Sequence, residues 1–393
     1  MERGRRVEID VLRGVAILLV VVYHAGPLSW RLAPYRADGW IEWPALGVLG
    51  WLAVPFLHFG FSGVHCFFVL SGFCIHLRGA RAAVRGEAAV PSLRKFFLRR
   101  FWRIYPPYWC ALVIFAVAPH VARALGMQTQ APPPGMGDVA LHAVMLHTMS
   151  VATFFSINPA FWSLATEEQF YLGYPMLARA MRRLGAARVL GAALVLTLAW
   201  RATALAVLPT TVDHFMQWRV WVHGLFLPRW FDWILGCLVA ELWAARPAWL
   251  AERRRGLAIG AIALLLLAMG CRVHVALDKL LSDPLFSTGF AALTCAVLGR
   301  ARARDEGLGD NKIQSGPTPV ARWSRQWIRP MGILLSRGMA ALGRRSYGIY
   351  LVHQPIVDLL ALPLALRGLL VAAASALFCR LCESPFEERS RKV

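Results

Sequence analysis

The chain contains long segments in which nearly every residue is apolar, so that a helix built from them has no polar face. Helices that are hydrophobic all round belong inside a membrane or a large core, and about 17–25 such residues match a bilayer's hydrocarbon layer. Because 58% of the 393 residues are hydrophobic, these segments recur throughout. A transmembrane β-barrel would show short alternating strands instead. We therefore predict an all-α, polytopic membrane protein.

Ten segments are predicted to be membrane spans, a few of them short for this purpose. They cover residues 9–26, 61–77, 101–123, 160–178, 189–208, 229–245, 256–272, 285–300, 342–360 and 364–381. Basic residues gather in alternate connections, which is the pattern of cytoplasmic loops. This pattern places both termini in the cytoplasm and predicts a multi-pass protein of the inner or plasma membrane.

Two further stretches on the predicted outer side, 40–60 and 138–155, are also rich in apolar residues. If either one crossed the membrane, every later loop would change sides and the charge bias would be lost. We therefore interpret both as interfacial or re-entrant segments. The 301–341 connection is polar and contains Gly and Pro, so it is predicted to be a mobile cytoplasmic loop. Residues 1–393 form one predicted membrane domain without a separate soluble domain.

The net charge of +21 is compatible with nucleic-acid binding. The basic residues lie in the connections between apolar segments, however, so we expect a lipid bilayer and no nucleic acid as partner. The eight cysteines lie mostly in apolar segments, so no disulfide framework is predicted. Cys379 and Cys382 form a CxxC pattern without a second ligand pair. We interpret them as packing thiols and predict no metal site.

Two ionisable residues, Arg13 and His24, occupy the first predicted span. The helical rise separates them by about 16 Å, half a bilayer, and charges at this depth usually serve chemistry, pairing or transport. His24 is a candidate general base, nucleophile or proton carrier; alternatively it is an interfacial histidine bonded to a loop. Arg13 keeps its proton and needs an anionic ligand or a partner such as Asp10.

Arg100 and Arg103, with Arg99 beside them, lie at the cytoplasmic end of the third predicted span. Guanidinium groups at this spacing can hold phosphates bidentately, whereas as positive-inside anchors they would contact lipid head groups. Ser71 and Gly72 lie inside the second predicted span. This pair fits either close helix packing or the passage of a narrow ligand.

Glu167 and Glu168 follow each other a couple of turns into the fourth predicted span. Adjacent helical residues point about 100° apart, so we expect one to face a polar cavity and the other to pair elsewhere. Glu167 is expected at the depth of His24, where a carboxylate would orient the imidazole. His353, three residues after Tyr350, is interpreted as a buried histidine with satisfied hydrogen bonds rather than as a catalyst.

Taken together, these motifs resemble those of acyltransferase family 3, membrane proteins that O-acylate extracytoplasmic glycans. The resemblance runs over almost the whole chain. Its motifs are Arg13 and His24 in an Asp-x-Leu-Arg-Gly context, residues 68–73, Arg100-x-x-Arg103 with 104–106, residues 162–171, residues 346–353 and residues 383–386. The order of these motifs and their positions on the predicted helices make the resemblance specific.

The resemblance implies a cytoplasmic acyl-CoA donor, with acetyl-CoA as the default, and an acceptor hydroxyl on an extracytoplasmic or lipid-linked glycan. Arg100 and Arg103 would bind the nucleotide end of the donor, and its pantetheine arm would pass Ser71 and Gly72. Arg13 would line this path or hold the bundle together.

His24 would deprotonate the acceptor hydroxyl for direct attack on the thioester, with an acyl-histidine intermediate as the rival mechanism. The acceptor's identity and the oligomeric state are not read from these motifs. The competing class is a proton-coupled transporter or flippase of a glycan or small anion, which would use the same charges. Its expected signature, paired broken helices in corresponding halves, is not evident in the sequence.

Overall fold

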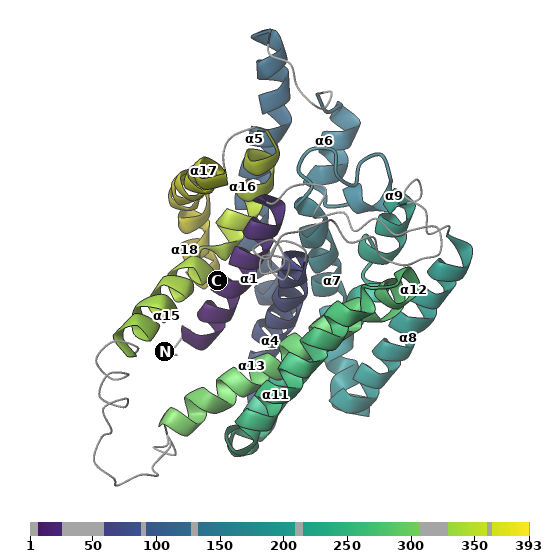
Figure 1. Ribbon diagram of the computed structural model, residues 1–393, viewed down its shortest axis with the longest axis vertical. Coiled ribbons are helices and arrows are strands. Elements are labelled where there is room, and N and C mark those ends of the chain that lie inside the picture. Colours follow the sequence, from purple (N-terminus) through teal and green to yellow (C-terminus); the bar gives the residue numbers. More distant parts are fainter. Residues whose placement is uncertain are drawn as a thin grey trace.

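The computed structural model describes residues 7–25, 59–87, 92–126, 133–208, 215–305, 329–359 and 364–392. The elements within these residues are helices, arranged as a bundle (Figure 1). Six helical stretches are long and apolar enough to cross a membrane: Gly60–Val84, Leu93–Ala124, Ala186–Val207, Pro247–Cys271, Val275–Arg304 and Leu366–Lys392. The all-α membrane fold is thereby confirmed, while the count of ten spans and the cytoplasmic termini stay predictions.

Each of the ten predicted segments contains a helix. These helices are α1 (Val7–Ala25), α4 (Gly63–Val84), α5 (Leu93–Ala124), α7 (Phe161–Leu184), α8 (Ala186–Val207), α10 (Trp230–Ala245), α11 (Pro247–Cys271), α13 (Asp283–Asp305), α16 (Ser346–Leu359) and α17 (Leu364–Phe378). Two more helices flank the last pair, α15 (Arg329–Arg344) before it and α18 (Ser384–Lys392) after it. A π-helical segment, η8 (Cys379–Glu383), joins α17 to α18.

Short elements connect the long helices on the predicted outer side. They are η1 (Gly60–Ser62), α6 (Met136–Ala143), η2 (His147–Met149), α9 (Phe215–Trp218), η4 (Arg219–His223), η5 (Leu227–Arg229), α12 (Val275–Leu277) and η6 (Asp278–Ser282). The stretch predicted as interfacial at 138–155 consists of α6, η2 and turns, which are too short to cross a bilayer. Most of the other such stretch, 40–60, lies outside the described residues.

The predicted loop at 301–341 is helical at both of its ends. Helix α13 continues to Asp305 and α15 begins at Arg329, while residues 306–328 lie outside the described residues. In Figure 1, α1 and α15 to α18 lie on one side of the bundle. Helices α8 and α9 lie on the other side, with α4 and α7 between the two groups. Helices α11 and α13 run diagonally across the lower part of the bundle, and Arg304 near the end of α13 pairs with Glu8 of α1.

Helices α4 and α10 approach each other closely through two glycines. A β-carbon at Gly72 would overlap the carbonyl oxygen of Trp233, and one at Gly236 would overlap that of Val69. Small residues permit this backbone approach between membrane helices. Gly72 therefore faces α10, and of its two predicted roles the structure supports close packing. Its neighbour Ser71 points to a different side of α4.

Candidate active site

A cavity of about 850 Å³ is bordered by residues of α1, α4, α5, α7, α15, α16 and α18. Five side chains predicted as site residues line it together: Arg13, Ser71, Arg100, Arg103 and Glu167. They come from four helices that are far apart in the sequence. The structure therefore joins into one site the motifs that the sequence presented separately.

Glu167 lies among hydroxyl groups in this cavity. Its carboxylate accepts hydrogen bonds from Ser71 Oγ and from the hydroxyl of Tyr171, one helical turn further along α7. Ser71 Oγ also accepts a hydrogen bond of 3.2 Å from the indole nitrogen of Trp233. Glu167 rather than Glu168 lines the cavity, which answers the question left open by the two adjacent glutamates.

Arg13 has the predicted partner Asp10 and also faces the cavity. It lines the cavity, and its guanidinium lies 3.7 Å from Asp10 Oδ1, one turn earlier on α1. It also donates a hydrogen bond to Cys74 Sγ at 3.3 Å. A guanidinium held by a neighbouring carboxylate can still present its remaining N–H groups to an anionic ligand.

The arginines of the cavity outnumber its carboxylates. Arg100 and Arg103 lie one turn apart on α5, and the Arg100 guanidinium is 5.9 Å from the centre of the Tyr171 ring. Among the described residues, six arginines and two glutamates line the cavity. Since an excess of positive charge in a partly enclosed site attracts anions, this cavity suits a strongly anionic ligand.

Contacts of Tyr350 connect the lining of the cavity to His24. Tyr350 and Ser163 both line the cavity, and their hydroxyl groups lie 2.7 Å apart. His353 Nδ1 lies 2.8 Å from the carbonyl oxygen of Tyr350, and His353 Nε2 lies 3.2 Å from His24 Nδ1. His24 Nδ1 is also 2.9 Å from the carbonyl oxygen of Val20. His24 and His353 therefore lie just beyond the Tyr350 end of the cavity.

The expected contact between Glu167 and His24 does not form. Glu167 lies six residues into α7, about 9 Å along the helix axis, whereas His24 belongs to the last turn of α1. Glu167 bonds to Ser71 and Tyr171, whereas His24 contacts Val20 and His353. His353, interpreted from the sequence as merely buried, occupies the place beside His24 that Glu167 was expected to fill.

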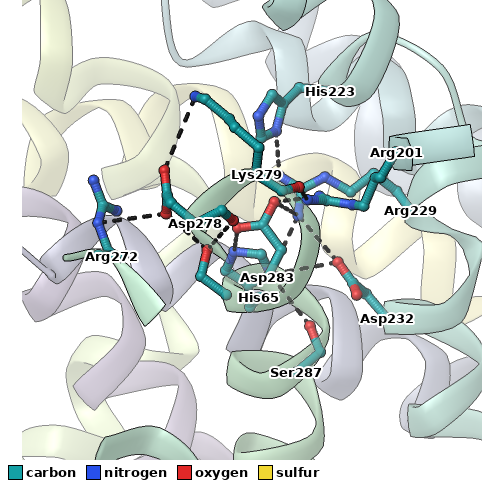
Figure 2. A network of polar contacts seen from close by, with 11 residues as sticks. His65, Arg201, His223, Arg229, Asp232, Arg272, Asp278, Lys279, Asp283 and Ser287 are labelled. Carbon is teal, nitrogen blue, oxygen red and sulfur yellow. Dashed lines mark hydrogen bonds and ion pairs between the residues drawn. The ribbon is translucent and has the colours of Figure 1, made fainter. Parts of the chain in front are cut away.

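A second polar cluster, shown in Figure 2, was missed by the sequence analysis. At its centre Asp283 of α13 pairs with Arg201 of α8, with Arg229 of η5 at 3.3 Å and with His65 of α4 at 3.1 Å. Asp232 of α10 lies 3.1 Å from Arg229 and 3.3 Å from His65. These five side chains are almost fully buried.

The sequence did contain a signal for this cluster. His65, Arg201, Arg229 and Asp232 all lie within predicted spans, where ionisable residues are rare and need partners. The cluster joins α4, α8, α10 and α13, and its acids pair with its bases. The Nε atoms of Arg201 and Arg229 have no hydrogen-bond partner among the described residues. We interpret it as a structural network that holds these four helices together.

Comparisons with known proteins show what the whole chain is similar to. A family model described as an acyltransferase domain matches residues 6–381. The chain is 25% identical to the peptidoglycan O-acetyltransferase OatA of Listeria monocytogenes, over 98% of this chain and 55% of that protein. It is also 25% identical to the putative peptidoglycan O-acetyltransferase YrhL of Bacillus subtilis, over 89% and 48% respectively. The chain thus spans about half the length of these curated relatives. No solved structure matches it.

Proposed function

The chain belongs to the acyltransferase domain family, and from this premise we propose that it transfers an acetyl group from cytoplasmic acetyl-CoA to a hydroxyl of an extracytoplasmic glycan. The observation that carries the proposal is the cavity, which has arginines towards one end and the His24–His353 pair beyond the other. Peptidoglycan is the acceptor class proposed, because both relatives are named for its O-acetylation.

The dimensions and charge of the cavity suit this donor. Its lining residues on α4 run from Val64 to Arg81, about 25 Å along the helix axis. An extended pantetheine arm is about as long as four extended residues, roughly 14 Å. With the pyrophosphate at Arg100 and Arg103, the arm would pass Arg13 and Ser71, and the thioester would approach Tyr350.

His24 is the proposed general base. It would take the proton of the acceptor hydroxyl while that oxygen attacks the thioester carbonyl, forming the new C–O bond. The C–S bond then breaks, and the departing thiolate of CoA receives the proton from His24. Glu167 is proposed to orient Ser71 and Tyr171 along the donor's path. An acyl-histidine intermediate is the rival route, and it would leave labelled acetyl groups on the protein after rapid denaturation at neutral pH.

The test uses the protein in nanodiscs with radiolabelled acetyl-CoA, measuring donor binding and slow thioester hydrolysis. We expect the wild type to bind and hydrolyse, His24→Ala to bind without hydrolysing, and Arg103→Ala to lose binding. Arg94→Ala is the matched control, because Arg94 lies exposed on the same helix, outside the cavity lining. If the wild type binds neither acetyl-CoA nor longer acyl-CoAs, the proposal fails and a transporter becomes the better interpretation.

Direction and acceptor need a second experiment. Sealed proteoliposomes would carry soluble peptidoglycan fragments inside, with labelled acetyl-CoA added only outside. Label on the enclosed glycan, lost in His24→Ala, would support transfer across the membrane. Label that appears only when donor and acceptor share one compartment would contradict it.

A further inference from the structure

The mouth of the cavity carries three arginines beyond those expected from the sequence. Arg81 lies near the end of α4, Arg344 at the end of α15 and Arg391 near the end of α18. Arg81 and Arg391 belong to segments predicted to face the cytoplasm, and Arg344 lies at the cytoplasmic end of the ninth predicted span. Three separate helices therefore direct a guanidinium to the side from which a cytoplasmic donor would enter.

The charge of the whole cavity matches that of the donor. Six arginines against two glutamates leave an excess of four positive charges among the described lining residues. The pyrophosphate and the 3′-phosphate of CoA together carry about four negative charges at neutral pH. Arg100 and Arg103 are proposed to bind the pyrophosphate. The three arginines of the mouth then remain for the 3′-phosphate.

Helix α18 is held firmly at this mouth. Ser390 Oγ donates a hydrogen bond of 2.9 Å to the carbonyl oxygen of Arg99 on α5. The Phe386 ring stacks on Trp102 at 6.3 Å, and the Arg389 guanidinium lies 5.0 Å from the centre of the same indole ring. Arg391 thus belongs to a helix docked on the segment that carries Arg100 and Arg103.

Arg391 is held by an acid of its own helix. Its Nη2 lies 2.8 Å from Glu387 Oε1, one turn earlier, and its side chain remains 66% exposed. A guanidinium has five N–H donors in a planar fork, so one bond to Glu387 orients the group and leaves other donors for a phosphate. Arg344 also lies exposed at the mouth.

From these contacts we infer that Arg391, assisted by Arg344, binds the 3′-phosphate of the donor nucleotide, so that helix α18 selects CoA over its 3′-dephospho form. The inference rests on the proposed function, since it adds a specificity element to the same donor site. A phosphate monoester of a lipid head group has the same chemistry, and the test separates these two sources.

The test compares the dissociation constants of CoA and 3′-dephospho-CoA in phosphatidylcholine nanodiscs, by competition with labelled acetyl-CoA. We expect the wild type to prefer CoA by roughly tenfold, the value of a charge-assisted hydrogen bond at a partly exposed site. Arg391→Gln should weaken the binding of CoA by a similar factor and leave the dissociation constant of 3′-dephospho-CoA unchanged. Arg344→Gln should change the affinity for CoA in the same direction. Lys392→Gln, next to Arg391 but outside the cavity lining, should change neither.

The outcomes are distinguishable. Arg103→Gln should weaken the binding of both ligands, because both contain the pyrophosphate. If Arg391→Gln weakened the binding of both ligands equally, the inference would be overturned, while the proposed donor site would remain intact. A selectivity change that appears only in nanodiscs containing phosphatidic acid would assign Arg391 to a lipid phosphate and also overturn it. A wild type that binds neither ligand would instead contradict the proposed function.

Discussion

The Nε2 atom of His353 lies 3.2 Å from the Nδ1 atom of His24, although 329 positions separate the two residues. The carbonyl oxygens of Tyr350 and Val20 lie beside the Nδ1 atoms of the two rings and can only accept hydrogen bonds. Both Nδ1 atoms therefore carry a proton. His24 shares its Nδ1 proton between Val20 and His353, and the lone pair of the neutral ring is on Nε2.

His353 is accordingly predicted to position His24. His353→Phe should lower kcat by roughly 10- to 100-fold, by analogy with the loss of a partner that orients a metal-binding histidine. The dissociation constant for acetyl-CoA should stay unchanged. His353→Gln, whose amide oxygen can accept the same proton, should restore part of the rate. Steady-state kinetics with parallel donor-binding measurements check this, and a lower donor affinity at full kcat would contradict it.

Gly72 is predicted to be a packing residue. Gly72→Ala would force α4 away from the Trp233 carbonyl. Such overpacking is expected to lower the free energy of unfolding by about 1–3 kcal/mol. Gly191→Ala on α8 is the matched control, because a β-carbon there meets open space and improves helix propensity by up to about 1 kcal/mol. Thermal unfolding in detergent should show a lower Tm for the first variant only. Equal Tm values would show that the helices move apart easily.

Asp283 is predicted to be the least replaceable residue of the buried network. Asp283→Ala would leave Arg201 and Arg229 without their shared carboxylate, which typically costs about 3–5 kcal/mol for a broken buried pair. Glu252→Ala, an exposed acid on α11, should have almost no effect. The comparison is made by Tm in nanodiscs, together with the yield of folded protein. Indistinguishable melting of the two variants would refute the structural role.

Acidity on the outer side is predicted to weaken the α6–η2 segment. The rings of His142 and His147 stack with centroids 4.0 Å apart, and burial, followed by the charge of His142, lowers the pKa of His147 to about 2. The unfolded chain therefore binds a proton near pH 6.5 that the folded chain rejects. The contribution of neutral His147 to the free energy of unfolding is therefore fully present above this pH and is lost below it. The loss is about 1.4 kcal/mol between pH 7.5 and 5.5.

His147→Phe should remove this part of the pH dependence of Tm, because the side chain no longer titrates. His120→Gln serves as the control, since His120 is exposed and its replacement should leave the slope of Tm against pH as in the wild type. A variant His147→Phe that melts with the wild-type pH dependence would exclude the histidine pair as its origin.

Much of the candidate site was predictable because its residues violate the rule that governs the rest of the chain. Arg13, Arg100, Arg103 and Glu167 are charges in or beside apolar segments, where each needs a reason. The same rule applied to Arg201 and Asp232 would have revealed the buried network.

The sequence by itself determined the all-α membrane fold, since a bilayer admits only apolar segments whose backbone groups bond internally. Only the tertiary structure decided which way each helix faces, because a helix apolar all round has no periodic pattern to orient it. Packing turned Gly72 towards α10, placed Glu167 beside Ser71 and brought His353 to His24. These contacts join residues far apart in the chain, so no local spacing could specify them.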